Sequence, residues 1–172
     1  QIDEKDRLLK PGLCVVDLGA APGSWSQVLA EKLGERGKII ALDLLPLEPI
    51  RNVNSIQGDF RENEVLRKLR DELAGAKVDL VFSDMAPNIS GIAVSDQARS
   101  RDLCELALEF AKEALKPGGS MLLKAFQGTG YPDFLSNMRL AFSEVVSRKP
   151  DASRGRSPEM YLLGKGFKVD RE

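Results

Sequence analysis

Short apolar runs alternate with amphipathic stretches along this chain. The apolar runs predict strands, and apolar residues at helical spacing predict the helices between them. We expect strands over residues 13–18, 38–44, 53–57, 78–84, 120–126, 143–148 and 159–164, and helices over residues 25–33, 63–73, 95–115 and 131–142. Breakers support these boundaries, above all the Lys-Pro-Gly-Gly stretch at 116–119, which is expected to end the longest helix.

Strands that alternate with helices favour a parallel sheet with helices on both faces. The length fits one domain, residues 1–172, which can bury a sizeable core. In such sheets a ligand binds beyond the carboxyl ends of the strands, where the strand order reverses. The predicted strands end in residues with useful chemistry at that edge, namely Asp17, Asp43, Asp59, Asp84 and Lys124.

Composition removes several function classes. The chain has no histidine, which excludes nucleophile systems and metal sites that depend on imidazole. Its two cysteines, Cys14 and Cys104, fall in a predicted strand and a predicted helix, so we expect neither zinc nor a disulfide. No apolar run approaches the roughly 20 residues that span a bilayer. We therefore expect a cytoplasmic protein, without membrane association or metal, and a monomer.

The net charge of −1 does not suggest a nucleic-acid partner, but the charges are unevenly distributed. Basic residues gather between positions 148 and 168, and the candidates for contact with RNA phosphates are Arg148, Lys149, Arg154 and Arg156. From charge alone, an ordinary solvated surface explains this cluster equally well.

The stretch DLGAAPGSW, residues 17–25, places Gly19 and Gly23 in the turn between the first strand and the first helix. Glycine there lets the backbone approach a ligand closely. The spacing does not match the dinucleotide fingerprint, and no Gly-Lys-Ser/Thr follows as in a phosphate-binding loop. A nicotinamide-dependent oxidoreductase is therefore disfavoured.

Two aspartates at successive strand ends indicate an adenosine ligand. Asp43 follows Gly23 by about 20 residues, where a carboxylate can accept both hydroxyls of a ribose. Asp59 could accept an adenine amino group while Phe60 packs on the ring. An adenosine cofactor that needs no pyrophosphate grip is S-adenosylmethionine.

The fourth strand ends in SDMAPN, residues 83–88, without the aromatic residue that stacks a flipped base in adenine-amino methylases. Lys124 is anomalous in an apolar strand, because burying an ammonium is costly unless it is paired. Either it reaches solvent at the strand end, or it is held against Asp84 in the cleft with Glu159 as a third charged member.

Taken in order, these motifs resemble the FtsJ/RrmJ family of ribose 2′-O-methyltransferases. The matching stretches are DLGAAPGSWSQ, DLLP, QGDF, SDMAPNISG, LKPGG, KAFQG and RKPDASRGRSPEMYL, which run from Lys10 to Gly164. The resemblance implies a Rossmann-like, class I S-adenosylmethionine-dependent methyltransferase fold with a seven-stranded, mostly parallel sheet. It is strongest to bacterial members that act on large-subunit ribosomal RNA.

The family's catalytic set is Lys-Asp-Lys-Glu, and the resemblance places its last three members at Asp84, Lys124 and Glu159. The first lysine and a basic N-terminal extension would fall upstream of Gln1. The family's cofactor-binding positions carry over to Gly23, Trp25, Asp43, Asp59 and Asp84, to which position in the predicted sheet adds Gly19 and Phe60.

The expected reaction is therefore S-adenosylmethionine-dependent methylation of a ribose 2′-hydroxyl, with a uridine of large-subunit ribosomal RNA as the expected target and ribosome maturation as the outcome. Relatives that methylate tRNA or an mRNA cap share this catalytic logic and remain alternatives. A non-catalytic RNA-binding assembly factor on the same scaffold is a further alternative, which the intact trio of Asp84, Lys124 and Glu159 disfavours.

Overall fold

The computed structural model describes residues 8–20, 24–85, 91–126, 128–149 and 160–169, and of residues 24 and 25 the backbone alone. Seven strands form one sheet in the order β3-β2-β1-β4-β5-β7-β6. Their bounds are β1 Cys14–Leu18, β2 Lys38–Asp43, β3 Val53–Gln57, β4 Val78–Ser83, β5 Leu115–Lys124, β6 Phe142–Arg148 and β7 Tyr161–Phe167. Within this sheet β7 runs antiparallel to both neighbours and the remaining pairs are parallel, which confirms the mostly parallel prediction.

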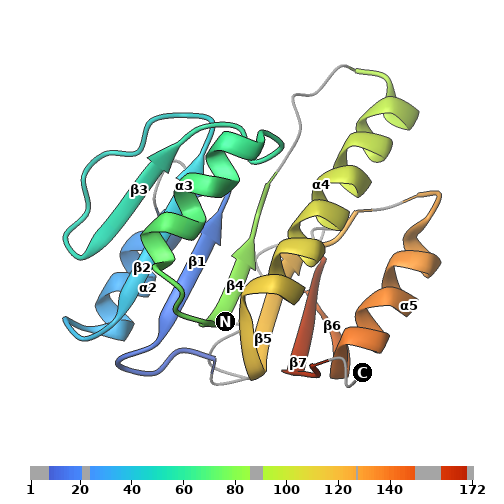
Figure 1. Ribbon diagram of the computed structural model, residues 1–172. Helices are drawn as coiled ribbons and strands as arrows, with labels where there is room; N and C mark the ends of the chain where they lie inside the picture. The colour runs from blue at the N-terminus through green and yellow to red at the C-terminus, as the bar shows by residue number, and fades with distance from the viewer. Residues whose placement is uncertain (1–7, 21–23, 86–90, 127, 150–159, 170–172) are drawn as a thin grey trace.

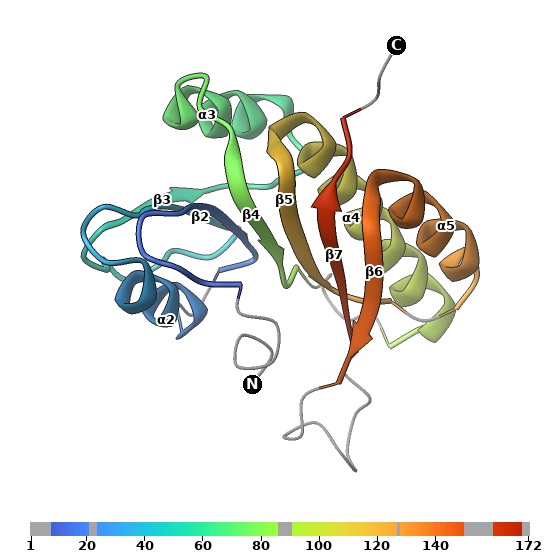
Figure 2. The same cartoon turned by 90° about the horizontal axis from the view of Figure 1, so that it is seen from below.

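Four described helices cover the two faces of the sheet. They are α2 Ser24–Leu33, α3 Asn63–Leu73, α4 Ala93–Ala114 and α5 Tyr131–Ala141. Figure 1 shows α3, α4 and α5 in front of the sheet with α2 behind it, and the view in Figure 2 agrees. The expectation of helices on both faces is confirmed. In the described ranges, no helix is both long enough and apolar enough to cross a membrane.

The apolar runs of the sequence form strands because both faces of this sheet are buried. Along β1, Val16 and Leu18 belong to the large core cluster under α3, α4 and α5. Val15, which points to the opposite face, packs with Leu29 and Leu33 of α2. A strand whose alternate residues pack into two different cores lacks the alternation of apolar and polar residues that marks a half-exposed strand.

The boundary between α4 and β5 differs from the prediction. The helix ends at Ala114 and the strand begins at the next residue, so the Lys-Pro-Gly-Gly stretch lies inside β5. The pairing with β4 shifts there, because Val78 is opposite Leu115 whereas Leu80 is opposite Ser120. The two glycines and the proline are thus accommodated in an irregularity of the strand, a common place for them in a sheet.

The last strand is also displaced from its predicted position. It was expected at residues 159–164 and runs from Tyr161 to Phe167, so that Glu159 precedes it. Gly166 continues the strand with a positive φ of 69°. Gly164, at the end of the predicted strand, and Gly166 beyond it are therefore both part of β7.

Candidate functional site

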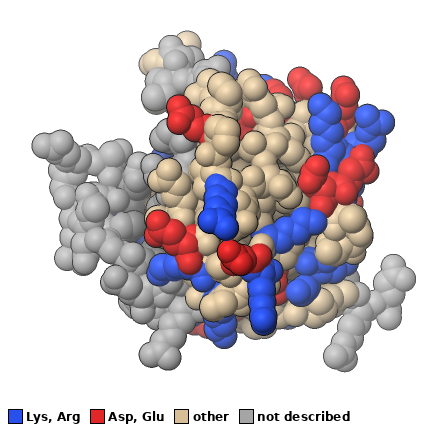
Figure 3. Space-filling model, turned by 90° about the vertical axis from the view of Figure 1, so that its left-hand side faces the viewer, with Lys and Arg blue, Asp and Glu red and all other residues tan. Residues whose placement is uncertain are grey.

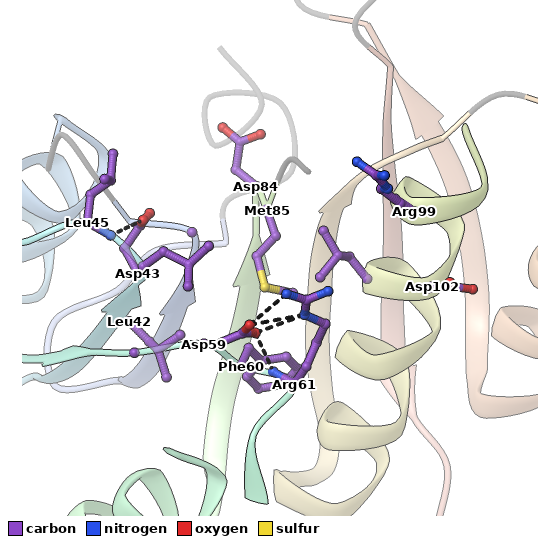
Figure 4. Close-up of a pocket in the computed structure, with 14 residues that line it drawn as sticks. Leu42, Asp43, Leu45, Asp59, Phe60, Arg61, Asp84, Met85, Arg99 and Asp102 are labelled. Carbon is purple, nitrogen blue, oxygen red and sulfur yellow. Dashed lines mark hydrogen bonds and ion pairs between the residues drawn. The ribbon is translucent and has the colours of Figure 1, made fainter. Parts of the chain in front are cut away.

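A cleft of about 540 Å³ opens at the carboxyl ends of β1, β2, β3 and β4, facing the first half of α4. Its position agrees with the rule that ligands bind where the strand order of a parallel sheet reverses. Five residues singled out from the sequence line this cleft together: Gly19, Asp43, Asp59, Phe60 and Asp84 (Figure 4). The fold has brought them together from four separate loops, and their roles toward a ligand remain predictions.

Gly19 is the point where the loops after β1 and β4 approach most closely. It has a φ of 76°, and a Cβ atom at this position would lie 2.8 Å from the carbonyl carbon and oxygen of Asp84. Its backbone N–H donates to the carbonyl of Leu42 at 2.8 Å. Only a residue without a side chain can hold the two loops at this separation.

Asp43 is held at the cleft by the turn that follows β2. Its Oδ1 accepts a hydrogen bond from the backbone N–H of Leu45 at 2.9 Å, the self-capping geometry that aspartate favours in turns. Leu44 and Leu45 follow it along the rim, and more than half of each side chain is exposed. The carboxylate is thus fixed beside an exposed apolar pair.

Asp59 is tied to Arg61, a residue that the motif analysis did not select. The Arg61 guanidinium donates to both carboxylate oxygens, at 2.7 Å from Nη2 to Oδ2 and 3.0 Å from Nε to Oδ1. Side-chain hydrogen bonding from Arg61 lowers the pKa of Asp59. The intervening Phe60 is buried and packs edge-to-face on Phe110, with ring centroids 5.8 Å apart, so it contacts the core as well as the cleft.

Asp17 is a fully buried carboxyl group beneath this site. Its Oδ2 accepts a hydrogen bond from the Ser26 hydroxyl at 2.7 Å, which joins the end of β1 to the first turns of α2. Its Oδ1 has no hydrogen-bond partner in the described structure. Burial raises the pKa of Asp17 to about 7, with smaller contributions from Ser26, which opposes the shift, and from Asp84 and Asp43.

The charged pair expected at the ends of β4 and β5 is present. The two strands pair in parallel with Phe82 opposite Leu122 and Ser83 opposite Leu123, so Asp84 comes to lie opposite Lys124. The Lys124 Nζ is 3.9 Å from Asp84 Oδ1. Both side chains are partly buried, with exposed fractions of 32% and 24%. Lys124 is therefore ion-paired with Asp84, which lines the cleft, while Lys124 itself is not among the lining residues.

Lys124 is also aligned with residues of the next two strands, so that a row of aligned residues crosses the sheet. Lys124 is opposite Tyr161 of β7, which is opposite Arg148 of β6. Residues opposite each other in antiparallel strands point to the same face, so Arg148 lies on the face of Lys124, about 10 Å away by two strand spacings. The following residue, Lys149, is exposed. Two of the four predicted RNA-binding residues thus lie at the edge of the sheet where the cleft opens.

The remaining predicted positions lie outside the described residues. These are Gly23, Glu159, Arg154 and Arg156, together with the side chain of Trp25.

The two cysteines do not form a nucleophile site. Cys104 is buried in α4 against β5, and burial raises the pKa of its thiol to about 12. Burial likewise raises the pKa of Cys14. Since a thiolate is the reactive form, neither residue suits the covalent attack that pyrimidine C5-methylation needs.

The cleft suits an adenosine cofactor. Carboxylates stand at or just after the ends of β2 and β3, and Gly19 brings no side chain into the cleft. Among the residues that the structure describes, no group of three or more aspartate, glutamate or cysteine side chains could hold a metal ion.

Motif reading missed the residues that complete the cleft: Arg61, Met85, Arg99, Asp102 and Leu103. Arg99, Asp102 and Leu103 sit in the first half of α4, where the sequence shows only amphipathic spacing, so nothing local separates them from a solvated helix. Arg61 had a detectable signal, because it lies two residues after Asp59, the spacing at which an aspartate caps its own turn.

Comparison with known proteins gives concordant matches. The family model described as FtsJ-like methyltransferase matches residues 1–167. A protein of Chromobacterium violaceum named ribosomal RNA large subunit methyltransferase E is 58% identical over 166 residues, which cover 96% of this chain and 81% of that protein.

Solved structures agree. A crystal structure described as a ribosomal RNA methyltransferase from Plasmodium falciparum superposes with a TM-score of 0.85 at 30% identity, and the match covers 99% of this chain and 94% of that one. Fibrillarin from Aeropyrum pernix, solved with natively bound S-adenosyl-L-methionine, shares the fold at a TM-score of 0.62 and 18% identity, over 90% of this chain and 67% of that one.

Proposed function

The chain belongs to the FtsJ-like methyltransferase family, and on that premise we propose that it transfers a methyl group from S-adenosylmethionine to a ribose 2′-hydroxyl of large-subunit ribosomal RNA. The observation that carries this proposal is the ion pair between Lys124 and Asp84 at the edge of the cofactor cleft. A lysine and an aspartate at this point match the acceptor chemistry of a hydroxyl group, which needs its proton removed. A thiolate or a base-stacking aromatic at this point would instead have favoured methylation of a base.

The residues divide into two groups along the cleft. Asp43 and Asp59 are the proposed acceptors for the ribose hydroxyls and the adenine amino group, and Gly19, Gly23, Trp25 and Phe60 are the other proposed cofactor-binding residues. When bound, S-adenosylmethionine supplies an electrophilic methyl group on a positively charged sulfur, directed toward the acceptor. Asp84 lines the same cleft and contacts Lys124, so it joins the cofactor site to the acceptor site.

At the acceptor side, a ribose hydroxyl is a poor nucleophile because it is scarcely ionised at neutral pH. It must be aligned with the methyl group and lose its proton as the new C–O bond forms. Lys124 is the proposed base or orienting group, and Asp84 fixes the position of its Nζ. Glu159 is proposed to orient the lysine or the incoming ribose.

Further parts of the proposal follow from the choice of substrate. We expect a uridine within the assembled large ribosomal subunit, a monomeric enzyme, and a cytoplasmic location, where ribosomal RNA is found. Residues 1–172 are treated as one methyltransferase domain, because all seven described strands belong to one sheet.

Cofactor titration tests the first half of the proposal. We expect S-adenosylhomocysteine to bind the full chain in isothermal titration and NAD not to bind. Tight binding of NAD without binding of S-adenosylhomocysteine would exclude the proposal at its first step.

Methyl transfer tests the second half. The protein is incubated with methyl-labelled cofactor and either large subunits or free ribosomal RNA, taken from cells that lack the gene. A 2′-O-methylated nucleotide resists alkaline cleavage on its 3′ side, so the product is expected as one alkali-stable dinucleotide. Label on a base, or in tRNA alone, would contradict the assignment.

A further inference from the structure

The Asp59 carboxylate is almost saturated with hydrogen bonds from a single residue. Its Oδ1 accepts from the backbone N–H of Arg61 at 2.9 Å and from the Arg61 Nε at 3.0 Å. Its Oδ2 accepts from Arg61 Nη2 at 2.7 Å, and Nε also lies 3.2 Å from this oxygen. Figure 4 shows the guanidinium fork set against the carboxylate inside the cleft.

The Asp59 carboxylate has few acceptor positions left for a ligand. An ionised carboxylate offers about four lone-pair positions. Three N–H groups of Arg61 point at this one: the backbone N–H at Oδ1, Nη2 at Oδ2, and Nε shared between the two oxygens. Because three donors face about four positions, about one acceptor position remains, chiefly on Oδ2. A bidentate guanidinium also fixes the plane of the carboxylate, which a single lysine or a water would not do.

We propose that Arg61 is a specificity-determining positioning residue of the cofactor cleft, which holds Asp59 so that one acceptor faces one N–H of a 6-aminopurine. This inference rests on the proposed function, in which Asp59 faces the adenine ring. Arg61 acts through Asp59 and through the two loops that it fixes.

A positioned Asp59 carboxylate can distinguish a 6-aminopurine from a 6-oxopurine. A single fixed acceptor forms a hydrogen bond with a 6-amino group. It disfavours a 6-oxopurine, because the carbonyl oxygen would face the carboxylate without a proton between them. The ionised carboxyl group of Asp59 is acceptor-only, and hydrogen bonding from Arg61, which lowers the pKa of Asp59, favours this form further. A protonated aspartate could donate to the oxo group and would lose this selectivity.

The opposite interpretation of the same ion pair is a gate, in which Arg61 competes with the cofactor for Asp59. The two interpretations predict opposite changes in cofactor affinity when Arg61 is removed. If Arg61 positions Asp59, its removal weakens binding and flattens selectivity. If it competes, its removal strengthens binding.

The experiment measures dissociation constants of S-adenosylhomocysteine and of its 6-oxo analogue, S-inosylhomocysteine, by isothermal titration on the full chain. The variants are Arg61→Met and Arg61→Gln. The matched control is Arg67→Met, because Arg67 is an exposed arginine of α3 whose ion pair with Glu64 lies outside the cleft. Thermal unfolding of each variant shows that it is folded.

For Arg61→Met we expect binding of S-adenosylhomocysteine to weaken about tenfold, corresponding to about 1.4 kcal/mol. The preference for the adenosyl over the inosyl compound should shrink by at least a similar factor. In methyl transfer, KM for the cofactor rises while kcat at saturation is unchanged. Arg67→Met behaves as wild type in every measurement.

A double-mutant cycle separates positioning from a general structural effect. In an Asp59→Asn background, Arg61→Met should cause no further loss of affinity, because the residue through which it acts is gone. Unchanged affinity and selectivity in Arg61→Met, or tighter binding, would overturn the inference. Failure of wild type to bind S-adenosylhomocysteine would instead refute the proposed function itself.

Discussion

Lys124 and Asp84 face each other because of sheet register, and the register also supplies a control for testing them. At the other end of the same strand, Lys116 forms an ion pair with Asp79 of β4 at 3.2 Å. The two pairs share strands and residue types, but only Asp84 lines the cleft. A comparison of the two lysines therefore isolates position from charge.

We predict that Lys124→Ala reduces methyl transfer by at least about 100-fold, the usual contribution of a general acid or base. Binding of S-adenosylhomocysteine should change little, since the cofactor cleft is lined by Asp84 and not by Lys124. Single-turnover transfer and titration measure the two effects. Lys116→Ala is expected to keep full transfer activity, and comparable losses in both variants would show that the pair at the cleft is only structural.

Asp17 gives a prediction for stability against pH. Its folded-state pKa of about 7 lies above the reference value of 3.8, so between these values the native state binds a proton that the unfolded state has released. The wild type consequently loses stability as pH rises through this window. An asparagine side chain cannot ionise, so the advantage of Asp17→Asn should grow from pH 5 to pH 8, by about 2.5 kcal/mol.

Urea unfolding of wild type and Asp17→Asn at several pH values measures this difference. A stability difference that does not change with pH would mean that Asp17 does not titrate in the window.

At the scale of single residues, some residues of the site could be predicted from the sequence and others could not. Asp43, Asp59 and Asp84 were identifiable because each stands at or just after the end of a predicted strand, and the parallel sheet aligns such ends. Arg61 was detectable from its spacing to Asp59 but was not selected, whereas the partnership of Asp17 with Ser26 depends on side-chain geometry between β1 and α2. The orphaned oxygen of Asp17 has no sequence signal at all.

At the level of elements, the close approach of the β1 and β4 loops at Gly19 constrains the shape of the cleft. We predict that Gly19→Ala weakens binding of S-adenosylhomocysteine by at least about tenfold, because the added methyl group would lie 2.8 Å from the Asp84 backbone and force the loops apart. It should also lower the free energy of unfolding by more than the 1–2 kcal/mol, roughly, that positive φ alone costs.

Gly34 provides the matched control, since it has a similar φ of 69° but no atom within 4 Å of a Cβ at that position. Gly34→Ala should lose only the backbone contribution to stability and keep its cofactor affinity. Equal effects of the two changes on binding would show that the close approach does not shape the cleft.

The elements themselves were largely predictable, and the failure at β5 has a physical cause. Strand cores with two buried faces, such as β1, β2 and β4, are readable from continuous apolar runs. The start of β5 was misplaced because the proline and glycines of residues 116–119 were interpreted as chain breakers, and β7 extends further than its predicted bounds. Inside a sheet the same residues are tolerated at irregularities that tertiary pairing stabilises.

On the scale of the whole molecule, the surface on the side of β3 carries charges of both signs. Figure 3 shows basic and acidic side chains intermingled over the face at the β3 edge, without a field of one sign. This face would not attract RNA strongly. Of the predicted RNA-binding residues, Arg148 and Lys149 lie on the opposite side of the sheet from β3, where β6 ends.

We predict that replacing Arg148 and Lys149 together by glutamine lowers RNA affinity and flattens its dependence on salt. For every phosphate that the variant no longer neutralises, the slope of log K against log salt concentration should fall by about 0.7 to 0.9. Filter binding over a range of salt concentrations measures the slope. The control is Arg51→Gln, which removes an exposed arginine paired with Glu35, and a slope equal in all three proteins would rule out the proposed RNA surface.

The antiparallel strand β7 lies between β5 and β6, although it is made after both. During synthesis, β5 therefore has one open edge and β6 has no partner until residues 161–167 have emerged from the ribosome. The row that joins Lys124 to Arg148 through Tyr161 does not exist before then. A chain still being translated can thus build the strands that line the cofactor cleft before it completes the alignment of Lys124 with Arg148.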